Sequence, residues 1–230
     1  LPAGDTVWYA ALPRVWRDRD ESALRTLLEW ARALGFTGVL IGNLGHLPLV
    51  RGLDFHLYGD YGLNVFNSRS LAYLKDKELE SACVSFELRF AQIRDLKKVL
   101  RAEAIVYGRL PLMITENCLV QNETGCRLDR QGLCVPEDGP CRCGQPNVLV
   151  DRTGAAFPLL PAYGHRTEIQ NSKPLYLADR PEHRRLGLAY ARLRFTTETA
   201  EECVSVVQNY LDAAPAAGDF TRGLYERGVE

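Results

Sequence analysis

The sequence has 230 residues, of which 46% are hydrophobic and 25% charged, with a net charge of −1. This composition supports a buried core and excludes a largely disordered chain, and the near-neutral balance argues against a polybasic nucleic-acid coat. The most apolar segment, 37–50, is interrupted by Gly, Asn, His and Pro, so no membrane span is expected. The N-terminus lacks Met and a signal-peptide pattern, which predicts a processed or excised end and a cytoplasmic protein.

Strand-like and helix-like segments alternate along the first 110 residues. Short apolar runs predict strands at 6–12, 38–42, 55–59, 82–86 and 104–107. Apolar residues at the helical period predict three helices between them, at 24–34, 69–77 and 91–100. Asp18 or Asp20 is placed to cap the first helix and Gly35 to end it, while Asn67 or Ser68 is placed to cap the second. This alternation predicts βαβ units and a parallel sheet.

The pattern changes after residue 117. Residues 118–146 are rich in Cys, Gly, Pro and charge without periodicity, which predicts an irregular insertion. The runs 148–150 and 156–159 flank a turn sequence and predict a β-hairpin. A sixth strand is expected at 188–195, followed by a helix at 200–211. The sequence therefore predicts an α/β fold with at most six strand–helix units, two fewer than an eight-fold barrel needs.

Five of the seven cysteines lie close together, and a histidine, His165, follows them. They are Cys118, Cys126, Cys134, Cys141 and Cys143. Thiolates and an imidazole are ligands of zinc and iron–sulfur sites, and a metal would offset the entropy lost in ordering a loop with few large apolar residues. The spacing contains no Cys-x-x-Cys pair, so disulfides and free thiols stay open as alternatives. Cys83 and Cys203 fall on apolar periodic positions and are predicted to be buried structural thiols.

A set of motifs occurs in a recognisable order along the chain. They are Gly59–Ser68 (GDYGLNVFNS), Ser85–Leu88 (SFEL), Gly108–Met113 (GRLPLM), Glu116–Cys118 (ENC), Asp151–Gly154 (DRTG), Asn171–Leu175 (NSKPL) and Thr221–Gly223 (TRG). Together they cover nearly the whole chain, which resembles the collagenase-like peptidase family U32. The resemblance implies an incomplete TIM-barrel-like fold of about six β/α units, with a Cys-rich insertion and a β-hairpin before the last unit. It also implies the C-terminal, barrel-like portion of a longer protein.

Three segments follow from this interpretation. Residues 1–117 hold the β/α units of the partial barrel, 118–175 the Cys-rich metal-binding insertion with its hairpin, and 176–230 the last β/α unit and the C-terminal tail. Relatives in the family bind an iron–sulfur cluster through four cysteines. Carried over by position, the ligands are Cys118, Cys126 and Cys143, with Cys141 as an alternative to Cys143, and the fourth position falls on His165. Because imidazole ligates both iron and zinc, the predicted cofactor is an iron–sulfur cluster or Zn²⁺.

The functional face of a barrel is formed by the C-terminal ends of its strands. The polar residues predicted there form the candidate pocket, which comprises Arg14, Asn43, Asp60, Glu87, Arg109 and Arg194. A structural interpretation stays open, in which Asp60 forms a turn and Glu87 pairs with Arg109. The sequence has neither His-Glu-x-x-His nor Gly-x-Ser-x-Gly, so no known protease motif accompanies the family label.

Three classes of function follow from the resemblance. The family label implies a peptidase, other relatives are linked to oxygen-independent hydroxylation of RNA bases or quinones, and the chain could instead be the non-catalytic, structural half of a longer enzyme. The expected partners are the missing N-terminal part of that chain and an RNA or peptide substrate, with no membrane. Because an incomplete barrel exposes sheet edges, self-association is also expected.

Overall fold

The computed structural model describes residues 6–128, 134–135 and 142–228. The chain divides into two compact units. The first unit comprises Leu1–Ile105, Arg180–Arg192 and Arg222–Glu230, and the second comprises Val106–Asp179 and Leu193–Thr221. Within the described residues, no helix is both long enough and apolar enough to cross a membrane.

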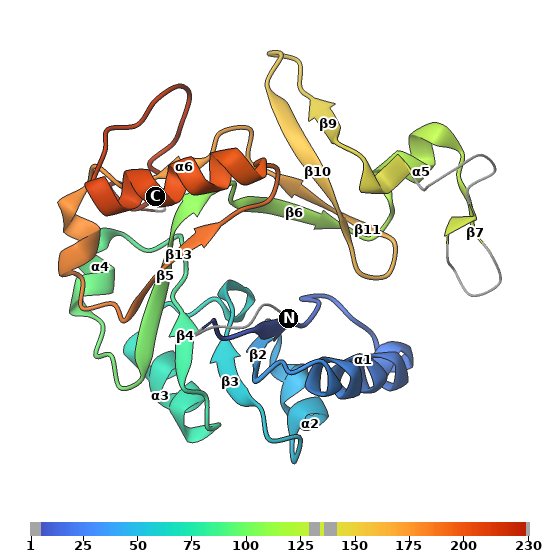
Figure 1. The fold of residues 1–230 in the computed structure, drawn as a ribbon, viewed down its shortest axis with the longest axis horizontal. Helices are drawn as coiled ribbons and strands as arrows, with labels where there is room; N and C mark the ends of the chain where they lie inside the picture. Colours follow the sequence, from blue (N-terminus) through green and yellow to red (C-terminus); the bar gives the residue numbers. More distant parts are fainter. Residues whose placement is uncertain (1–5, 129–133, 136–141, 229–230) are drawn as a thin grey trace. The chain divides into compact units, whose positions relative to one another are not determined.

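The first unit contains a parallel sheet. Its strands pair in chain order and are β1 (Tyr9–Ala11), β2 (Gly38–Ile41), β3 (His56–Gly59), β4 (Ser81–Cys83) and β5 (Arg101–Gly108). The helices that follow the first four strands are α1 (Glu21–Ala33), α2 (Leu47–Val50), α3 (Ser68–Asp76) and α4 (Phe90–Asp95). Figure 1 shows α1, α2 and α3 on the same side of the strands. Almost every residue of β2 and β4 is buried, which explains why their sequences are continuous apolar runs.

The core of the first unit lies between this sheet and its helices. Leu24 and Leu28, one helical turn apart on α1, are buried together, and Leu71 and Leu74 are buried on α3. Tyr225 is also buried, and its hydroxyl donates to the carbonyl of Ile105 at 2.6 Å. The C-terminal segment of the chain is therefore part of this core.

The helix ends show which capping predictions were correct. The Asn67 side chain accepts the amides of Arg69 and Ser70, each at 3.0 Å, and caps α3 as predicted. No side chain caps α1, because the Asp20 carboxylate turns back to accept the Arg17 amide at 2.8 Å; the prediction of an Asp18 or Asp20 cap was wrong.

The predicted helix at 91–100 is shorter in the structure. It ends at Asp95, and Leu96 is already extended. The Lys98 ammonium donates to the carbonyl of Ile93 at 2.6 Å, so a lysine side chain satisfies the carbonyls at the end of the helix.

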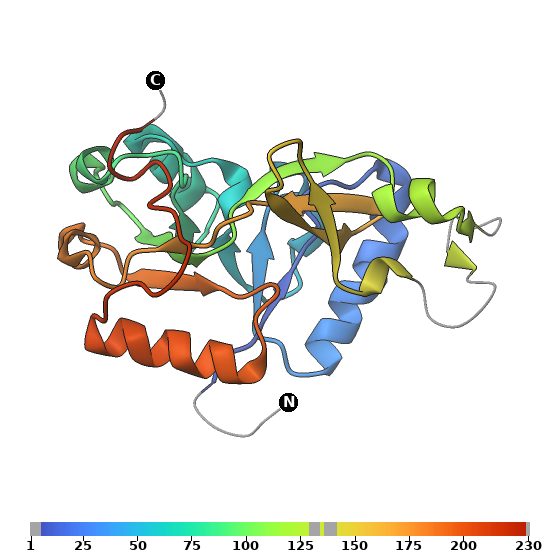
Figure 2. The same cartoon turned by 90° about the horizontal axis from the view of Figure 1, so that it is seen from above.

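The second unit contains a separate antiparallel sheet. Its strands lie in the order β6 (Pro111–Thr115), β11 (Arg166–Gln170), β10 (Ala156–Ala162) and β9 (Asn147–Val150), as Figures 1 and 2 show. The β9–β10 hairpin was predicted, and Asp151 closes its turn by accepting the amides of Thr153 and Ala155. The predicted insertion contains α5 (Leu119–Thr124), β7 (Arg127–Leu128) and β8 (Cys134–Val135).

An aromatic core holds the remaining elements of the second unit. They are the end of β5, β12 (Leu175–Tyr176), the end of β13 (Tyr190–Arg194) and α6 (Ala200–Asp212). Tyr107, Tyr176 and Tyr210 pack together, and the Tyr210 hydroxyl accepts the Leu177 amide at 2.8 Å. Cys203 was predicted to be buried but is partly exposed, because α6 turns Val206 toward the core instead.

The fold class predicted from the sequence is confirmed. A mostly parallel, curled sheet with about six β/α units forms an incomplete, TIM-barrel-like α/β fold, and β13 pairs with β5 to supply the last unit. The antiparallel sheet β6–β11–β10–β9 is separate from it. The three predicted segments are stretches of sequence, whereas the compact units interleave distant parts of the chain, so the segment boundaries stay a prediction.

Candidate functional site

Four of the six predicted pocket residues lie at one edge of the first unit. Arg14, Asn43, Asp60 and Glu87 follow β1, β2, β3 and β4 respectively, and the carboxyl ends of parallel strands meet at the same edge. The Asn43 amide donates to the carbonyl of Arg14 at 3.3 Å, which ties the first two loops together. The structure therefore brings these four residues to the edge where the sequence predicted a pocket.

Two aromatic rings join these residues. The guanidinium carbon of Arg14 lies 5.5 Å from the centre of the Tyr61 ring, and the Tyr61 and Phe86 rings are 6.1 Å apart. All three side chains are half-buried. They form a continuous row of planar groups, the Arg14–Tyr61–Phe86 row, and Glu87 follows its last member.

The turn that carries Tyr61 has room only for glycine at the next position. A Cβ on Gly62 would lie 2.5 Å from the carbonyl oxygen of Gly42 and 2.8 Å from Cδ of Arg14. The loops after β1, β2 and β3 thus meet in direct contact around Gly62. This close approach gives a physical reason for the glycine in the Gly59–Ser68 motif.

Asp60 has a structural role at this edge. Its Oδ1 accepts the Tyr61 amide at 2.9 Å and caps the short 3₁₀ turn Tyr61–Leu63, so the interpretation of Asp60 as a turn former is confirmed. The same oxygen pairs with Nη1 of Arg192, whose Nη2 lies 2.5 Å from Oε1 of Glu103. Arg192 and Glu103 were not predicted, because residues far apart in sequence give no local signal of such a pair.

The other two predicted pocket residues, Arg109 and Arg194, belong to the second unit. Nη1 of Arg109 donates to the carbonyls of Asn171, at 3.0 Å, and Ser172. Arg194 donates to the Arg109 carbonyl at 2.7 Å, and it pairs with Glu168 at 2.7 Å. Both guanidinium groups therefore fasten segments of the second unit. A pair between Glu87 and Arg109 stays a prediction, since these residues lie in different units.

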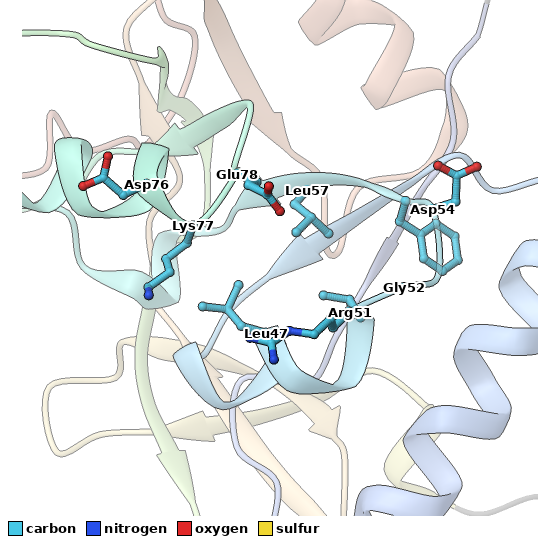
Figure 3. A pocket seen from close by; sticks show the side chains of 10 residues that line it. Leu47, Arg51, Gly52, Asp54, Leu57, Asp76, Lys77 and Glu78 are labelled. Atoms are coloured by element: carbon cyan, nitrogen blue, oxygen red, sulfur yellow. The ribbon is translucent and has the colours of Figure 1, made fainter.

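A pocket of about 390 Å³ opens at the other end of the first unit (Figure 3). Its lining residues are Leu47, Val50, Arg51, Gly52, Asp54, Phe55, Leu57, Asp76, Lys77 and Glu78. Residues 51–55 directly precede β3, so this pocket is at the amino end of that strand. None of the predicted site residues lines it.

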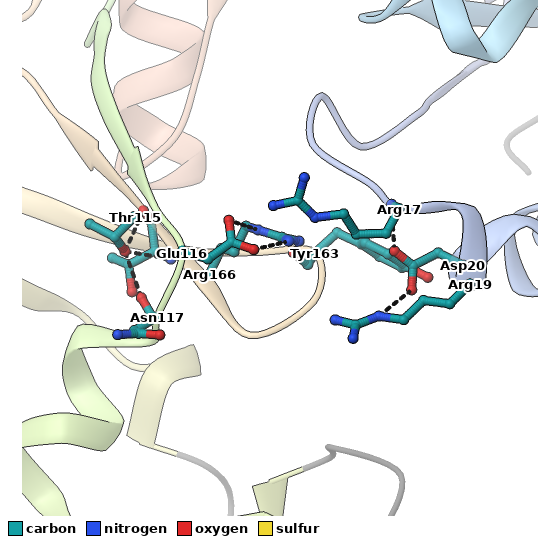
Figure 4. A network of polar contacts seen from close by, with 9 residues as sticks. Arg17, Arg19, Asp20, Thr115, Glu116, Asn117, Tyr163 and Arg166 are labelled. Carbon is teal, nitrogen blue, oxygen red and sulfur yellow. Dashed lines mark hydrogen bonds and ion pairs between the residues drawn. The ribbon is translucent and has the colours of Figure 1, made fainter.

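In the second unit, side chains hold the segment around Cys118 beside the turn that contains His165 (Figure 4). Arg166 is buried and makes two contacts with the Glu116 carboxylate, at 2.7 and 3.1 Å. The Thr167 hydroxyl accepts the amide of Leu119 at 3.0 Å. Two of the four predicted metal ligands therefore lie on neighbouring segments. Figure 4 also draws Arg17, Arg19 and Asp20 of the first unit.

The predicted metal ligands that the structure describes are not gathered around one point. Cys118 is buried and its sulfur accepts the Gln121 amide at 3.4 Å, while the Cys126 sulfur lies 3.1 Å from the Thr124 hydroxyl. Among the residues that the structure describes, no three His, Cys, Asp or Glu side chains converge as a metal ion requires. Cys141 lies outside the described residues. The ligand set therefore stays a prediction, and no chemical step is derived through a metal.

The fold and the strand-end residues define a class of protein, an incomplete α/β barrel with polar and aromatic side chains at the carboxyl edge of its sheet. Residues 4–148, more than half of the chain, match the model of peptidase family U32, and the chain therefore belongs to this family. None of the curated proteins compared with the chain matches it. The family resemblance read from the sequence motifs is confirmed, although the match ends before His165.

Proposed function

We propose that this member of family U32 is a hydrolase that binds an unfolded polypeptide along the carboxyl edge of β1–β4. The observation that carries the proposal is the half-buried Arg14–Tyr61–Phe86 row, which the half-buried Glu87 follows directly in the sequence. Aromatic faces bury side chains and peptide planes of an extended chain at little cost in entropy. A neighbouring carboxylate supplies the acid–base chemistry that peptide hydrolysis needs.

The charges in this region favour a polypeptide over RNA. RNA binding depends on cationic side chains that face phosphate groups. Arg192, the guanidinium that pairs with the loop after β3, is instead occupied by Asp60 and Glu103. With the net charge of −1, these pairs leave little positive potential for a nucleic acid.

In the proposed reaction, Glu87 is the general base. Its amide donates to the Ser85 hydroxyl at 3.3 Å, which supports the loop, and within the described residues its carboxylate forms no ion pair. The carboxylate takes a proton from water, the resulting hydroxide attacks the peptide carbonyl, and the same proton then passes to the leaving amine. Cys83 is not a nucleophile in this scheme, because burial raises the pKa of its thiol well above the ordinary value.

We expect Glu87→Gln to lower the rate of gelatin cleavage about 100-fold or more, the effect typical of losing a general base. Gelatin binding, measured by fluorescence titration, should persist, and the melting temperature should change little. Glu29→Gln is a matched control, because Glu29 is exposed on α1, away from the strand ends. Cleavage that is equal in Glu87→Gln and the control would rule out the proposed base. Binding without any cleavage by the unaltered protein would overturn the hydrolase proposal and favour the non-catalytic alternative.

A metal site on the Cys-rich insertion is a second proposal. It is favoured by the contacts of Arg166 and Thr167, which hold the segment of Cys118 beside that of His165. The residues that would bind zinc or an iron–sulfur cluster are Cys118, Cys126, Cys143 and His165, with Cys141 as the alternative to Cys143. In either case the metal would cross-link the loop and stabilise it.

We expect protein purified without oxygen to contain iron with sulfide, or zinc, and we expect His165→Ala to lose most of it, because one ligand of four is removed. Elemental analysis and the visible absorption spectrum distinguish the two metals. Cys203→Ala, which changes a cysteine outside the insertion, should keep the full metal content. An equal metal content in His165→Ala and Cys203→Ala would show that His165 is not a ligand.

A further inference from the structure

We propose that Arg192 is a positioning residue of the candidate site. Its guanidinium is shared between Asp60 and Glu103, and protonation of Glu103 releases it to Asp60, which makes the Tyr61 turn respond to pH. The effect on polypeptide binding rests on the proposed function, whereas the coupling between these side chains does not.

The pair between Arg192 and Asp60 is shielded from solvent. The side chains are only 18% and 16% exposed, and the pair joins β13 to the loop after β3. Removing one member of such a pair leaves an uncompensated charge in a region of low dielectric constant. The position of the Asp60 carboxylate is therefore set by Arg192 and not by solvent.

The position of the Asp60 carboxylate in turn affects the Tyr61 turn at the carboxyl edge of β1–β4. The oxygen that pairs with Arg192 also accepts the Tyr61 amide at 2.9 Å, and the Asp60 carbonyl accepts the Leu63 amide at 3.0 Å. Gly62, in the same turn, approaches Arg14 and the backbone of Gly42 closely. A shift of the Asp60 carboxylate therefore moves Tyr61 relative to Arg14.

Glu103 makes the arrangement sensitive to protons. Its buried Oε1 forms an ion pair with Arg192, 2.5 Å from Nη2. The charged or titratable groups that face it are Asp60 after β3, Cys83 on β4 and Arg192 on β13. Burial raises the pKa of Glu103, and the Arg192 guanidinium opposes this increase. Two carboxylates that share one guanidinium favour uptake of a proton as the pH falls.

The direction of the response follows from this charge balance. Above the pKa of Glu103, Arg192 is divided between two carboxylates. Below it, Glu103 is neutral, Arg192 pairs with Asp60 alone, and the cap on the Tyr61 turn is strengthened. Glu103→Gln mimics the protonated form at every pH.

The test is the NMR signal of the Tyr61 amide in the full chain, followed between about pH 5 and pH 8. In the unaltered protein the resonance should shift with an apparent pKa above that of an exposed glutamate. In Glu103→Gln this shift should be absent. In Arg192→Lys, which keeps the charge but loses the fork geometry, exchange of this amide should become about tenfold faster. Arg32→Lys, exposed on α1, is the control and should behave like the unaltered protein.

Gelatin binding at the same pH values provides the functional measurement. We expect affinity to rise toward acidic pH in the unaltered protein, to be independent of pH in Glu103→Gln, and to fall about tenfold in Arg192→Lys. A Tyr61 shift that persists unchanged in Glu103→Gln would overturn the inference. If the shift disappears as expected but gelatin does not bind, the coupling holds and the proposed function is wrong.

Discussion

Gly108→Ala should destabilise the protein by roughly 4 kcal/mol, a loss seen only when a substitution disrupts a core or strains the backbone. Gly108 has a φ of +115°, where side-chain-bearing residues rarely occur. An added Cβ would lie well inside van der Waals contact with the carbonyl oxygen of Arg194, 2.9 Å from its carbonyl carbon and 3.1 Å from its Cβ. These are mainly backbone atoms of a strand, so they cannot move aside without repacking.

The arginine at this contact is itself held in place. Arg194 donates to Gln170 at 2.6 Å and pairs with Glu168 at 2.7 Å, while Gly108 is paired with Leu175 in the sheet. Relieving the contact would break one of these interactions. The loss of stability can be measured as the free energy of unfolding in urea, with circular dichroism as the signal.

Gly154→Ala is the control that measures the cost of a positive φ without the close contact that an added Cβ makes at Gly108. Gly154 also has a positive φ, +83°, but no atom lies within 4 Å of an added Cβ in its turn. Only the conformational cost applies there, so a loss of about 1 kcal/mol is expected. Equal losses at Gly108 and Gly154 would mean that the contact with Arg194 contributes nothing.

The sequence predicted the parallel half of the fold well, because that half carries local signals. The run 38–42 became β2 at Gly38–Ile41, and the helix expected at 200–211 became α6 at Ala200–Asp212. Buried parallel strands are apolar runs and amphipathic helices repeat every 3.6 residues, so each can be recognised without its neighbours. The family motifs then placed these elements in one fold.

The antiparallel half carried a weaker signal. β11 buries three polar residues, Arg166, Thr167 and Gln170, which do not look like the inner face of a strand. They can be buried because distant groups satisfy them, as Glu116 does for Arg166. β6 and β11 pair across about fifty residues, and that pairing cannot be inferred from either strand alone.

The candidate site shows the same limit. The functional face of a barrel is formed by the C-terminal ends of its strands, and this rule placed Arg14, Asn43, Asp60 and Glu87 at one edge of the sheet. The rule needs only the positions at which the strands end. It did not indicate which side chains are available for binding and which are held by partners. Asp60 is held by Arg192 from a strand much later in the chain, whereas the Tyr61 and Phe86 rings, inside the recognised motifs, belong to the proposed binding surface.

Acid should destabilise the protein through one buried histidine. His46 is fully buried in the first unit, with Nε2 3.1 Å from the carbonyl oxygen of Pro13, and its ring stacks on Trp16 at 5.9 Å. Nδ1 has no hydrogen-bond partner among the described residues. Burial lowers the pKa of His46 to about 4, although the bond to Pro13 opposes this change. The folded protein therefore keeps the ring neutral where an unfolded chain would protonate it.

The sign of the pH effect follows from this difference. As the pH falls from about 6.5 to about 4, His46 becomes protonated in the unfolded state but stays neutral in the folded state. The free energy of unfolding therefore decreases by about 3 kcal/mol. Urea unfolding at a series of pH values measures the slope. His46→Gln should be less stable at neutral pH by about 1–2 kcal/mol, because the stacking on Trp16 is lost, but its stability should fall less on acidification.

His56→Gln provides the matched histidine control. His56 is 60% exposed and pairs with Glu80 at the surface, and an exposed pair contributes less than about 1 kcal/mol. This variant should keep nearly the full acid sensitivity of the unaltered protein. An acid slope that is the same in His46→Gln as in His56→Gln would assign the sensitivity to other groups. A reduced slope in His46→Gln alone would identify the loop after β2, at the carboxyl edge of the sheet, as the part of the first unit that acid opens.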